Sequence, residues 1–165
     1  MLLTTHRLLL REFVEDDWPA VLAYQSDPRY LAGYPWTERT PDDVRACVQR
    51  FIAWQHERPR TKFQLAITLG TAGPVIGNCE LAPSMWGRGY ATEAARAMLA
   101  FGFERLHLHR VWAWCLDENE PSARVLERLG LRREGTLLEN RWFKGQWHHS
   151  RIYAILEHEW RTPAV

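Results

Sequence analysis

The sequence lacks the features that mark several common protein classes. Its three cysteines, Cys47, Cys79 and Cys115, are an odd number, far apart and without a Cys-x-x-Cys pair, so a disulfide framework and a cysteine-based zinc site are both disfavoured. Lys and Arg number 21 against 20 Asp and Glu, which leaves a net charge of +1 and no basic field for nucleic acid or an anionic membrane.

Long apolar runs are also absent, since the longest span only a few residues and are too short for a bilayer-spanning helix. The first seven residues have neither the basic end nor the apolar core of a signal peptide. From this composition and a length of 165 residues we predict one cytoplasmic domain, residues 1–165, that binds neither membranes nor nucleic acid.

What is present is an alternation of strand and helix patterns, which favours an α/β fold. Thr40-Pro41-Asp42-Asp43 combines a hydroxyl cap, a proline at the first helical position and acids in the first turn, and Asp16 or Asp17 is placed to cap an earlier helix. Helices are expected over residues 16–26, 41–55, 90–106 and 120–130, and strands over residues 7–13, 62–69, 74–81, 110–116, 131–143 and 147–157.

The most informative segment runs from Leu81 to Ala94, where an apolar strand ends at Pro83 and a glycine-rich loop leads directly into a helix. The first turn of a helix leaves backbone N–H groups unpaired, and Gly87 and Gly89 would let a ligand approach the main chain closely. This arrangement predicts a phosphate-binding loop. The alternative is a glycine turn that holds no ligand.

Two other glycine-loop motifs are excluded. A P-loop requires Gly-Lys-Ser/Thr, where this chain has Gly-Arg-Gly-Tyr, and a dinucleotide-binding loop requires a third glycine where Thr92 stands.

A second motif places Asn119 and Ser122 one helical turn apart, where a strand gives way to a helix that should end at Gly130. The alternative reading is that Asn119 only caps this helix.

Together these motifs resemble the GNAT superfamily of N-acetyltransferases, and specifically its RimJ/RimL-like branch. Residues 86–91, Trp-Gly-Arg-Gly-Tyr-Ala, match the family's acyl-CoA motif Gln/Arg-x-x-Gly-x-Gly/Ala, with tryptophan in its first place. The Asn-x-x-Ser pair, the opening segment 5–11 and the tail 145–156 also resemble that branch. The resemblance implies a mixed central sheet with helices on both faces, splayed between two central strands.

The resemblance also implies roles for single residues. Backbone N–H groups of Gly87, Arg88, Gly89, Tyr90, Ala91 and Thr92 would hold the pyrophosphate of acetyl-CoA, a co-substrate. Leu81 would pair with the pantetheine arm, Asn119 would hydrogen-bond it, and Ser122 would lie near the sulfur. Arg88, Arg124 or Arg128 could meet the 3′-phosphate, or simply form solvated surface.

Acetyl transfer needs a neutral amine and a stabilised thioester oxygen, which a backbone N–H of the Glu80–Leu81 strand could stabilise. Ser122 is our candidate donor to the departing sulfur. Glu80 is the candidate general base and Glu139 a second one, although both could be ordinary exposed carboxylates. A weak base favours an acceptor with a low pKa, such as an α-amino group.

Other chemistry-bearing residues point to no separate site. His148 and His149 are adjacent on a strand, so they face opposite sides and cannot share a metal, and no metal site is expected. Cys115 is expected to be a small buried hydrophobe. Tyr30, Tyr34, Trp36 and Trp54 could line an acceptor pocket or pack in the core.

The chain departs from the family at Cys79-Glu80, where a hairpin's length of sequence is absent. A true deletion, an engineered one and unlisted residues would all explain it.

We therefore expect an N-acetyltransferase that transfers the acetyl group of acetyl-CoA to a primary amine, either a protein N-terminus or a small molecule, by direct attack in a ternary complex. The alternatives are a non-catalytic acyl-CoA-binding module or sensor, and an interaction domain with an empty loop. A homodimer would agree with the resemblance. The sequence does not identify the acceptor.

Overall fold

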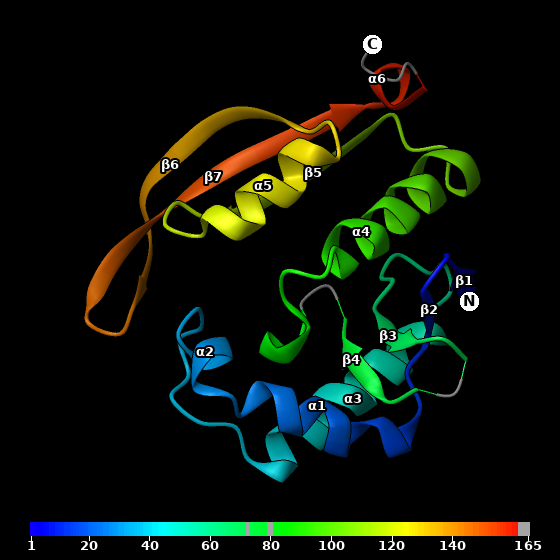
Figure 1. Ribbon diagram of the computed structural model, residues 1–165, viewed down its shortest axis with the longest axis vertical. Coiled ribbons are helices and arrows are strands. Elements are labelled where there is room, and N and C mark those ends of the chain that lie inside the picture. Colours follow the sequence, from blue (N-terminus) through cyan, green and yellow to red (C-terminus); the bar gives the residue numbers. More distant parts are fainter. Residues whose placement is uncertain (72, 79–80, 162–165) are drawn as a thin grey trace. The chain divides into compact units, whose positions relative to one another are not determined.

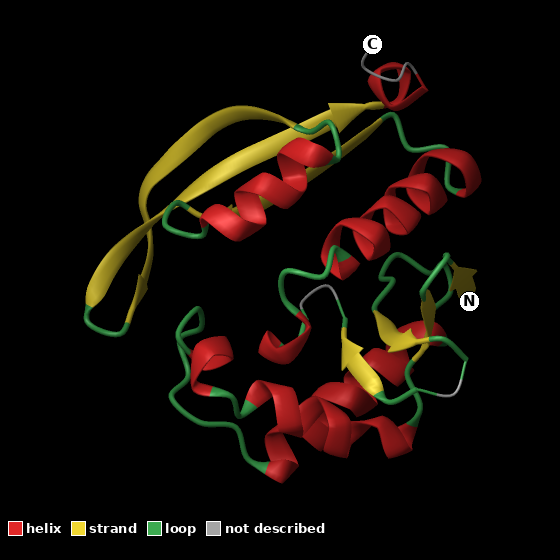
Figure 2. Cartoon of the chain, in the orientation of Figure 1, coloured by secondary structure: helices red, strands yellow, loops and turns green. Residues whose placement is uncertain are grey.

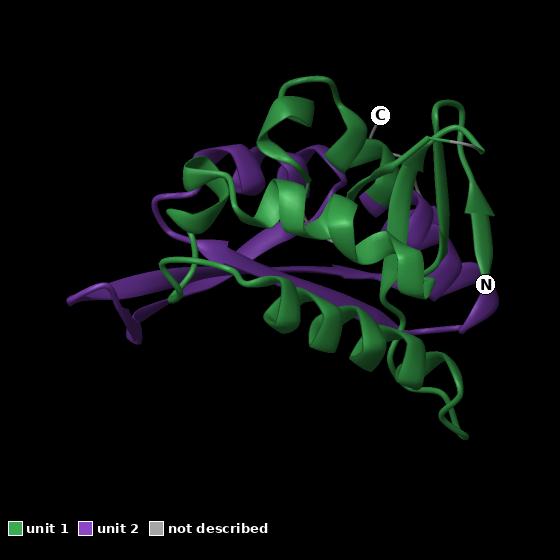
Figure 3. Ribbon diagram, turned by 90° about the horizontal axis from the view of Figure 1, so that it is seen from below, with its two compact units in different colours: residues 1–94 green, residues 95–165 purple. Residues whose placement is uncertain are grey.

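The computed structural model describes residues 1–71, 73–78 and 81–161. The chain divides into two compact units, residues 1–94 and 95–165, which Figure 3 colours separately. Each unit is described by itself below. The single-domain organisation stays a prediction from length.

Unit 1 contains a four-stranded antiparallel sheet with the order β1-β2-β3-β4. Its strands are β1 (Leu2–Thr4), β2 (Leu8–Glu12), β3 (Leu65–Leu69) and β4 (Val75–Gly77). The strands expected over residues 7–13 and 62–69 are thus confirmed as β2 and β3, whereas β1 was not expected. The register places Leu10 opposite Ile67, both buried.

The strand expected over residues 74–81 is wrong in its length. β4 ends at Gly77, and Leu81 forms an antiparallel bridge back to Gly77, with the Ala82 N–H donating to the Ile76 carbonyl at 2.8 Å. Leu81 therefore runs antiparallel to the end of β4. The prediction of a single strand passed over Gly77-Asn78, a pair that is typical of turns. Cys79 and Glu80, where we expected the missing hairpin, lie outside the described residues.

The helices of unit 1 begin where the local signals place them. The elements are η1 (Glu15–Asp17), α1 (Trp18–Gln25), α2 (Pro28–Leu31) and α3 (Pro41–Gln55). At α3 the capping box is complete, because the Thr40 hydroxyl accepts from the Asp43 N–H at 3.2 Å and the Asp43 carboxylate accepts from the Thr40 N–H at 3.0 Å.

At α1 the expected side-chain cap is wrong. The Asp17 carboxylate accepts from the Val14 N–H and forms a two-bond ion pair with Arg11, so it ties β2 to the helix start without capping α1 itself. The short helix α2, which Asp27 caps, was not expected.

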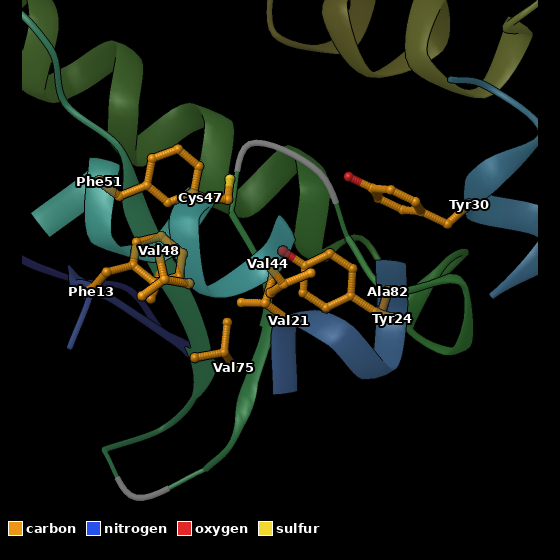
Figure 4. Close-up of a cluster of buried hydrophobic side chains, with 11 residues drawn as sticks. Phe13, Val21, Tyr24, Tyr30, Val44, Cys47, Val48, Phe51, Val75 and Ala82 are labelled. Atoms are coloured by element: carbon orange, nitrogen blue, oxygen red, sulfur yellow. The ribbon is translucent and has the colours of Figure 1, made fainter. Parts of the chain in front are cut away.

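The core of unit 1 lies between these helices and the sheet (Figure 4). Phe13 and Phe51 pack with ring centroids 5.1 Å apart, and Val21, Val44 and Val48 are almost completely buried. The tyrosines continue this core, since the buried Tyr30 stacks on Tyr34 and Tyr34 stacks on Trp36. Trp54 packs on Phe51 at the edge of the same core.

After β4 the chain passes through the short turn η2 (Pro83–Met85) into α4 (Tyr90–Ala100), which continues as the π-helical turn η3 (Phe101–Arg105). The helix expected over residues 90–106 is confirmed (Figure 2). Its last turn, Phe101–Arg105, has the wider hydrogen-bond spacing of a π-helix.

Unit 2 contains an antiparallel sheet of order β5-β7-β6 with the helix α5 along one face (Figure 1). Its elements are β5 (Arg110–Leu116), α5 (Glu120–Arg128), β6 (Arg132–Phe143), β7 (Gln146–Leu156) and α6 (Glu157–Arg161). The three expected strands and the hairpin at Lys144-Gly145 are confirmed, and α6 takes over where β7 was expected to reach residue 157.

Alternation along β7 separates two faces of this sheet. Tyr153 and Ile155 point toward α5 and form its core with Cys115 of β5. His148, Ser150 and Ala154 occupy the other face and are also buried. The α/β class is confirmed, with strands divided between two sheets.

Candidate functional site

The loop between η2 and α4 is shaped by its two glycines. Gly87 and Gly89 have φ values of +75° and +79°, a left-handed conformation that other L-residues adopt only with strain. The Trp86 indole N–H donates to the Leu81 carbonyl at 2.9 Å and closes the loop from inside. The backbone therefore makes two sharp bends before it enters α4 at Tyr90.

The backbone N–H groups of this loop are available for hydrogen bonds to a ligand. The first hydrogen bond of α4 runs from the Glu93 N–H to the Gly89 carbonyl at 3.1 Å. Within the described ranges, the N–H groups of residues 87–92 have no acceptor. Residues 87–89 are exposed and residues 90–92 half-buried. Because these N–H groups coincide with the positive end of the α4 dipole, the loop is chemically suited to a phosphate.

An ionic cluster that the sequence patterns did not reveal holds this loop to the segment between β1 and β2. Glu93, in the first turn of α4, accepts hydrogen bonds from the Thr5 hydroxyl at 2.6 Å, the Arg7 N–H at 2.8 Å and the Arg7 Nε at 2.7 Å. The Arg7 Nη1 also donates to the Arg88 carbonyl at 2.9 Å, and its guanidinium lies over the Tyr90 ring. We call Thr5, Arg7 and Glu93 the loop clamp.

Glu93 remains ionised in this setting. Burial by itself raises the pKa of Glu93, but the hydrogen bonds from Thr5 and Arg7 outweigh it, so the pKa lies below its usual value. Arg7 and Glu93 are 86 positions apart in the sequence, which explains why no spacing rule found the clamp. The only sequence signal was an acid in the first turn of a helix, a placement that many helices share.

Leu81 is buried beside β4 with its N–H directed away from it. Because the bond from Ala82 to Ile76 flanks the bridge, the N–H and carbonyl of Leu81 point to the other side, where Trp86 takes the carbonyl. In the part of the chain that the structure describes, the Leu81 N–H has no acceptor. Glu80, the predicted base, lies outside the described residues and stays a prediction.

Asn119 and Ser122 come together at the start of α5 in unit 2. The Asn119 Oδ1 accepts from the Ser122 N–H at 3.1 Å, so Asn119 caps the helix. A capping oxygen leaves the amide nitrogen of Asn119 available, and among the described residues neither that nitrogen nor the Ser122 hydroxyl has a hydrogen-bond partner. A ligand-binding role and the cap are therefore compatible.

Arg151 of β7 fixes the α5 start against the sheet. Its guanidinium bonds Asp117 at 2.8 Å and Glu120 at 2.5 Å, which lowers the pKa of both carboxylates and raises that of the arginine. These residues were not singled out from the sequence.

The remaining candidates divide between core and surface. Burial raises the pKa of the Cys115 thiol, so it stays protonated, in keeping with a buried hydrophobe. Arg88, Arg124 and Arg128 are exposed, and the exposed Glu139 donates its N–H to His149 Nδ1.

Residues 1–71, 73–78 and 81–161 hold no cluster of three or more His, Cys, Asp and Glu side chains suited to a metal ion. Over the same ranges, no helix has both the length and the apolar character needed to cross a lipid bilayer.

Comparison with known proteins points to one family. A family model described as an acetyltransferase (GNAT) domain matches residues 7–132. The uncharacterized N-acetyltransferase YnaD of Bacillus subtilis is 35% identical over 97% of this chain and 99% of its own length. That alignment spans 175 residues, more than this chain contains, so YnaD has residues that this chain lacks.

Solved structures of similar fold indicate the same family. A GNAT-family acetyltransferase from Bacillus anthracis is 31% identical and superposes with a TM-score of 0.84 over 96% of this chain and 99% of its own. RimL, a ribosomal L7/L12 alpha-N-protein acetyltransferase in complex with coenzyme A, shares the fold at 20% identity, with a TM-score of 0.78 over 94% of this chain and 98% of its own.

Proposed function

Because the chain belongs to the GNAT acetyltransferase family, in its RimJ/RimL-like branch, and is an N-acetyltransferase, we propose that it transfers the acetyl group of acetyl-CoA to a primary amine by direct attack in a ternary complex. The acceptor is a protein N-terminus or a small-molecule amine. The observation that carries the proposal is that the backbone N–H groups of residues 87–92 have no hydrogen-bond acceptor within the described residues.

The pyrophosphate binds to these amides. A diphosphate carries several acceptor oxygens, and each charge-assisted hydrogen bond to an N–H contributes about 1.5–3 kcal/mol. The two glycines support this role, since no atom of the described chain lies within 4 Å of the place where a Cβ of Gly87 would stand. The loop clamp keeps the amides in place before the ligand arrives, which reduces the ordering that binding requires.

In this proposal the thioester lies along the Leu81 backbone. The Leu81 N–H is directed away from β4 and hydrogen-bonds either the pantetheine arm or the carbonyl oxygen of the thioester, where negative charge develops during attack. The amide nitrogen of Asn119 donates to the same arm, and the Ser122 hydroxyl donates to the sulfur as the thiolate leaves. Glu80, predicted from the sequence, is one candidate for the general base.

The test combines binding with transfer. Calorimetry with CoA is carried out on the wild type, Gly87→Ala and the matched control Gly145→Ala. Gly145 lies in the β6–β7 turn at φ +78°, also with open space at its Cβ position, so both variants strain the backbone by about 1–2 kcal/mol. Only Gly87→Ala is expected to raise the Kd of CoA, by about tenfold.

Thiol release from acetyl-CoA is then measured with a panel of peptides with free N-termini, polyamines and lysine analogues. Equal affinity in all three proteins would contradict the phosphate loop. Tight CoA binding without thiol release from any amine would instead indicate a non-catalytic acyl-CoA-binding module. Dimer formation and a cytoplasmic location stay predictions.

A further inference from the structure

His148 is held rigidly inside unit 2. Its side chain is 7% exposed on β7, and its ring stacks on Phe143 with centroids 3.8 Å apart and planes 8° from parallel. Its Nδ1 lies 2.5 Å from the Glu118 carboxylate. Because a carboxylate only accepts hydrogen bonds, the ring proton belongs on Nδ1, and Nε2 carries a free lone pair.

That lone pair has no partner. Nε2 is fully covered and makes no hydrogen bond within the described chain, and the same holds for the hydroxyl oxygen of Ser150, which is 1% exposed. Residues 148 and 150 point to the same face of β7, so the two unsatisfied atoms belong to side chains on one face of the sheet. Buried polar atoms without partners are rare, and two together indicate a place where the polar group of a ligand completes the bonding.

This pair lies at the end of the sheet where α5 begins. Glu118 directly precedes the cap residue Asn119, the Asp117 N–H donates to the His149 carbonyl at 3.0 Å, and Leu116 pairs with Ser150. The partner of His148, Glu118, thus directly precedes Asn119, which is assigned above to the pantetheine arm. An ammonium group must lose a proton before it can attack a thioester, and a proton acceptor in the active site provides for this step.

Resting on the proposed function, we propose that His148 is the general base of this enzyme, that Glu118 orients its ring, and that Ser150 hydrogen-bonds the acceptor amine. Nε2 removes one proton from the substrate ammonium. The neutral amine then forms the N–C bond, the C–S bond breaks, and the second amine proton ends on the thiolate. His148 releases its proton to water, so one net proton leaves for each acetyl group transferred.

Three groups of unit 2 lie around the ring at this level of the sheet. Glu118, from the turn between β5 and α5, contacts the ring at Nδ1. Arg141 stands opposite His148 in the β6 register and stacks its guanidinium on Trp114. β5 contributes the uncharged Leu116, and His149 points to the other face.

The test is His148→Asn, which keeps an amide near Nδ1 to bond Glu118 but removes Nε2. Acetylation of a fixed amine by acetyl-CoA is measured across pH 6–10, with CoA affinity measured by calorimetry. At pH 7 we expect kcat to fall at least 100-fold with the Kd of CoA unchanged. The deficit should shrink as the pH rises, because the amine then deprotonates without help, and a purely structural loss would not show this rescue.

His149→Asn is the matched control, with the same change one residue away on the opposite face, and is expected to keep wild-type kcat. If His148→Asn unfolds, His148→Gln provides the same test with an amide near the position of Nε2. A kcat within threefold of wild type, or a deficit that does not vary with pH, overturns the role of His148 alone. A wild type that transfers acetyl to no amine overturns the proposed function together with this inference.

Discussion

At the scale of single residues, Glu93 affects both the stability of unit 1 and the position of the candidate phosphate-binding loop. It is 17% exposed and accepts three short hydrogen bonds that join the β1–β2 connection to the first turn of α4. Its neighbours Arg88 and Tyr90 are both contacted by Arg7. One carboxylate thus connects the stability of unit 1 with the position of the candidate phosphate amides.

We predict that Glu93→Gln lowers the free energy of unfolding by about 1–2 kcal/mol at pH 7, because it removes a charged acceptor. The pKa of Glu93 is lowered in the folded state, so its contribution is complete above the ordinary glutamate pKa and is lost as the pH falls through the folded value. Urea unfolding at pH 7 and at pH 3 should therefore show the wild-type advantage shrink on acidification.

The control for this experiment is Glu57→Gln. Glu57 forms an ion pair with the half-exposed Lys62 at 3.1 Å, and such surface pairs contribute about 0–1 kcal/mol. Glu93→Gln should also weaken CoA binding, and Glu57→Gln should not. Equal effects of both variants would show that the loop clamp has no special role.

At the scale of elements, the start of α5 performs two tasks with one side chain. The Asn119 Oδ1 caps the helix, while its amide nitrogen is the proposed donor to pantetheine. Asp at the same position retains the capping oxygen and loses the donor. The two tasks are therefore separable by mutation.

We predict that Asn119→Ala costs about 1 kcal/mol of stability and that Asn119→Asp costs little. Both should raise the Kd of CoA about five- to tenfold, the effect of one hydrogen bond. Thermal unfolding and calorimetry measure the two quantities. Thr40→Ala, which removes the α3 cap, is the control that loses stability without losing affinity. Unchanged CoA affinity in Asn119→Asp would restrict Asn119 to capping.

At the scale of the whole molecule, ion pairs determine how stability responds to acid. In unit 1, burial by itself raises the pKa of Glu12, but hydrogen bonds from Arg60 and the N-terminal amine outweigh it and the pKa is lowered. In unit 2, hydrogen bonds from Arg151 and Arg110 lower the pKa of Asp117 and Glu134. Each of these carboxylates binds its proton more weakly in the folded chain than in the unfolded one.

We expect the contribution of these carboxylates to the free energy of unfolding to be constant from pH 6 to 8. It should decrease as the pH falls below about 4.5, because carboxylates of the unfolded chain then begin to take up protons. Urea midpoints measured at half-unit steps from pH 3 to 8 test this. Since many of the pairs are exposed, 1 M salt should flatten the decrease. A midpoint that rises on acidification would contradict the assignment.

Local signals in the sequence predicted much of this architecture. The Thr40-Pro41 start of α3, the Asn119 cap of α5 and the turn at Lys144-Gly145 each depend on residues a few positions apart, and each is confirmed. The short elements β1, α2 and α6 were missed because three to five residues carry too little periodicity. The antiparallel bridge between Gly77 and Leu81 was missed because the turn-forming pair Gly77-Asn78 was included in a single predicted strand.

What the sequence by itself determined is the family, the helix caps and the glycine loop, because these are properties of neighbouring residues and of backbone conformation. Only the tertiary structure decided which distant groups meet: Arg7 with Glu93, Arg151 with Asp117, and Glu118 with His148. The physical reason is that such contacts depend on strand register and helix placement. Both are set by the burial of whole faces, which no short segment of the chain contains.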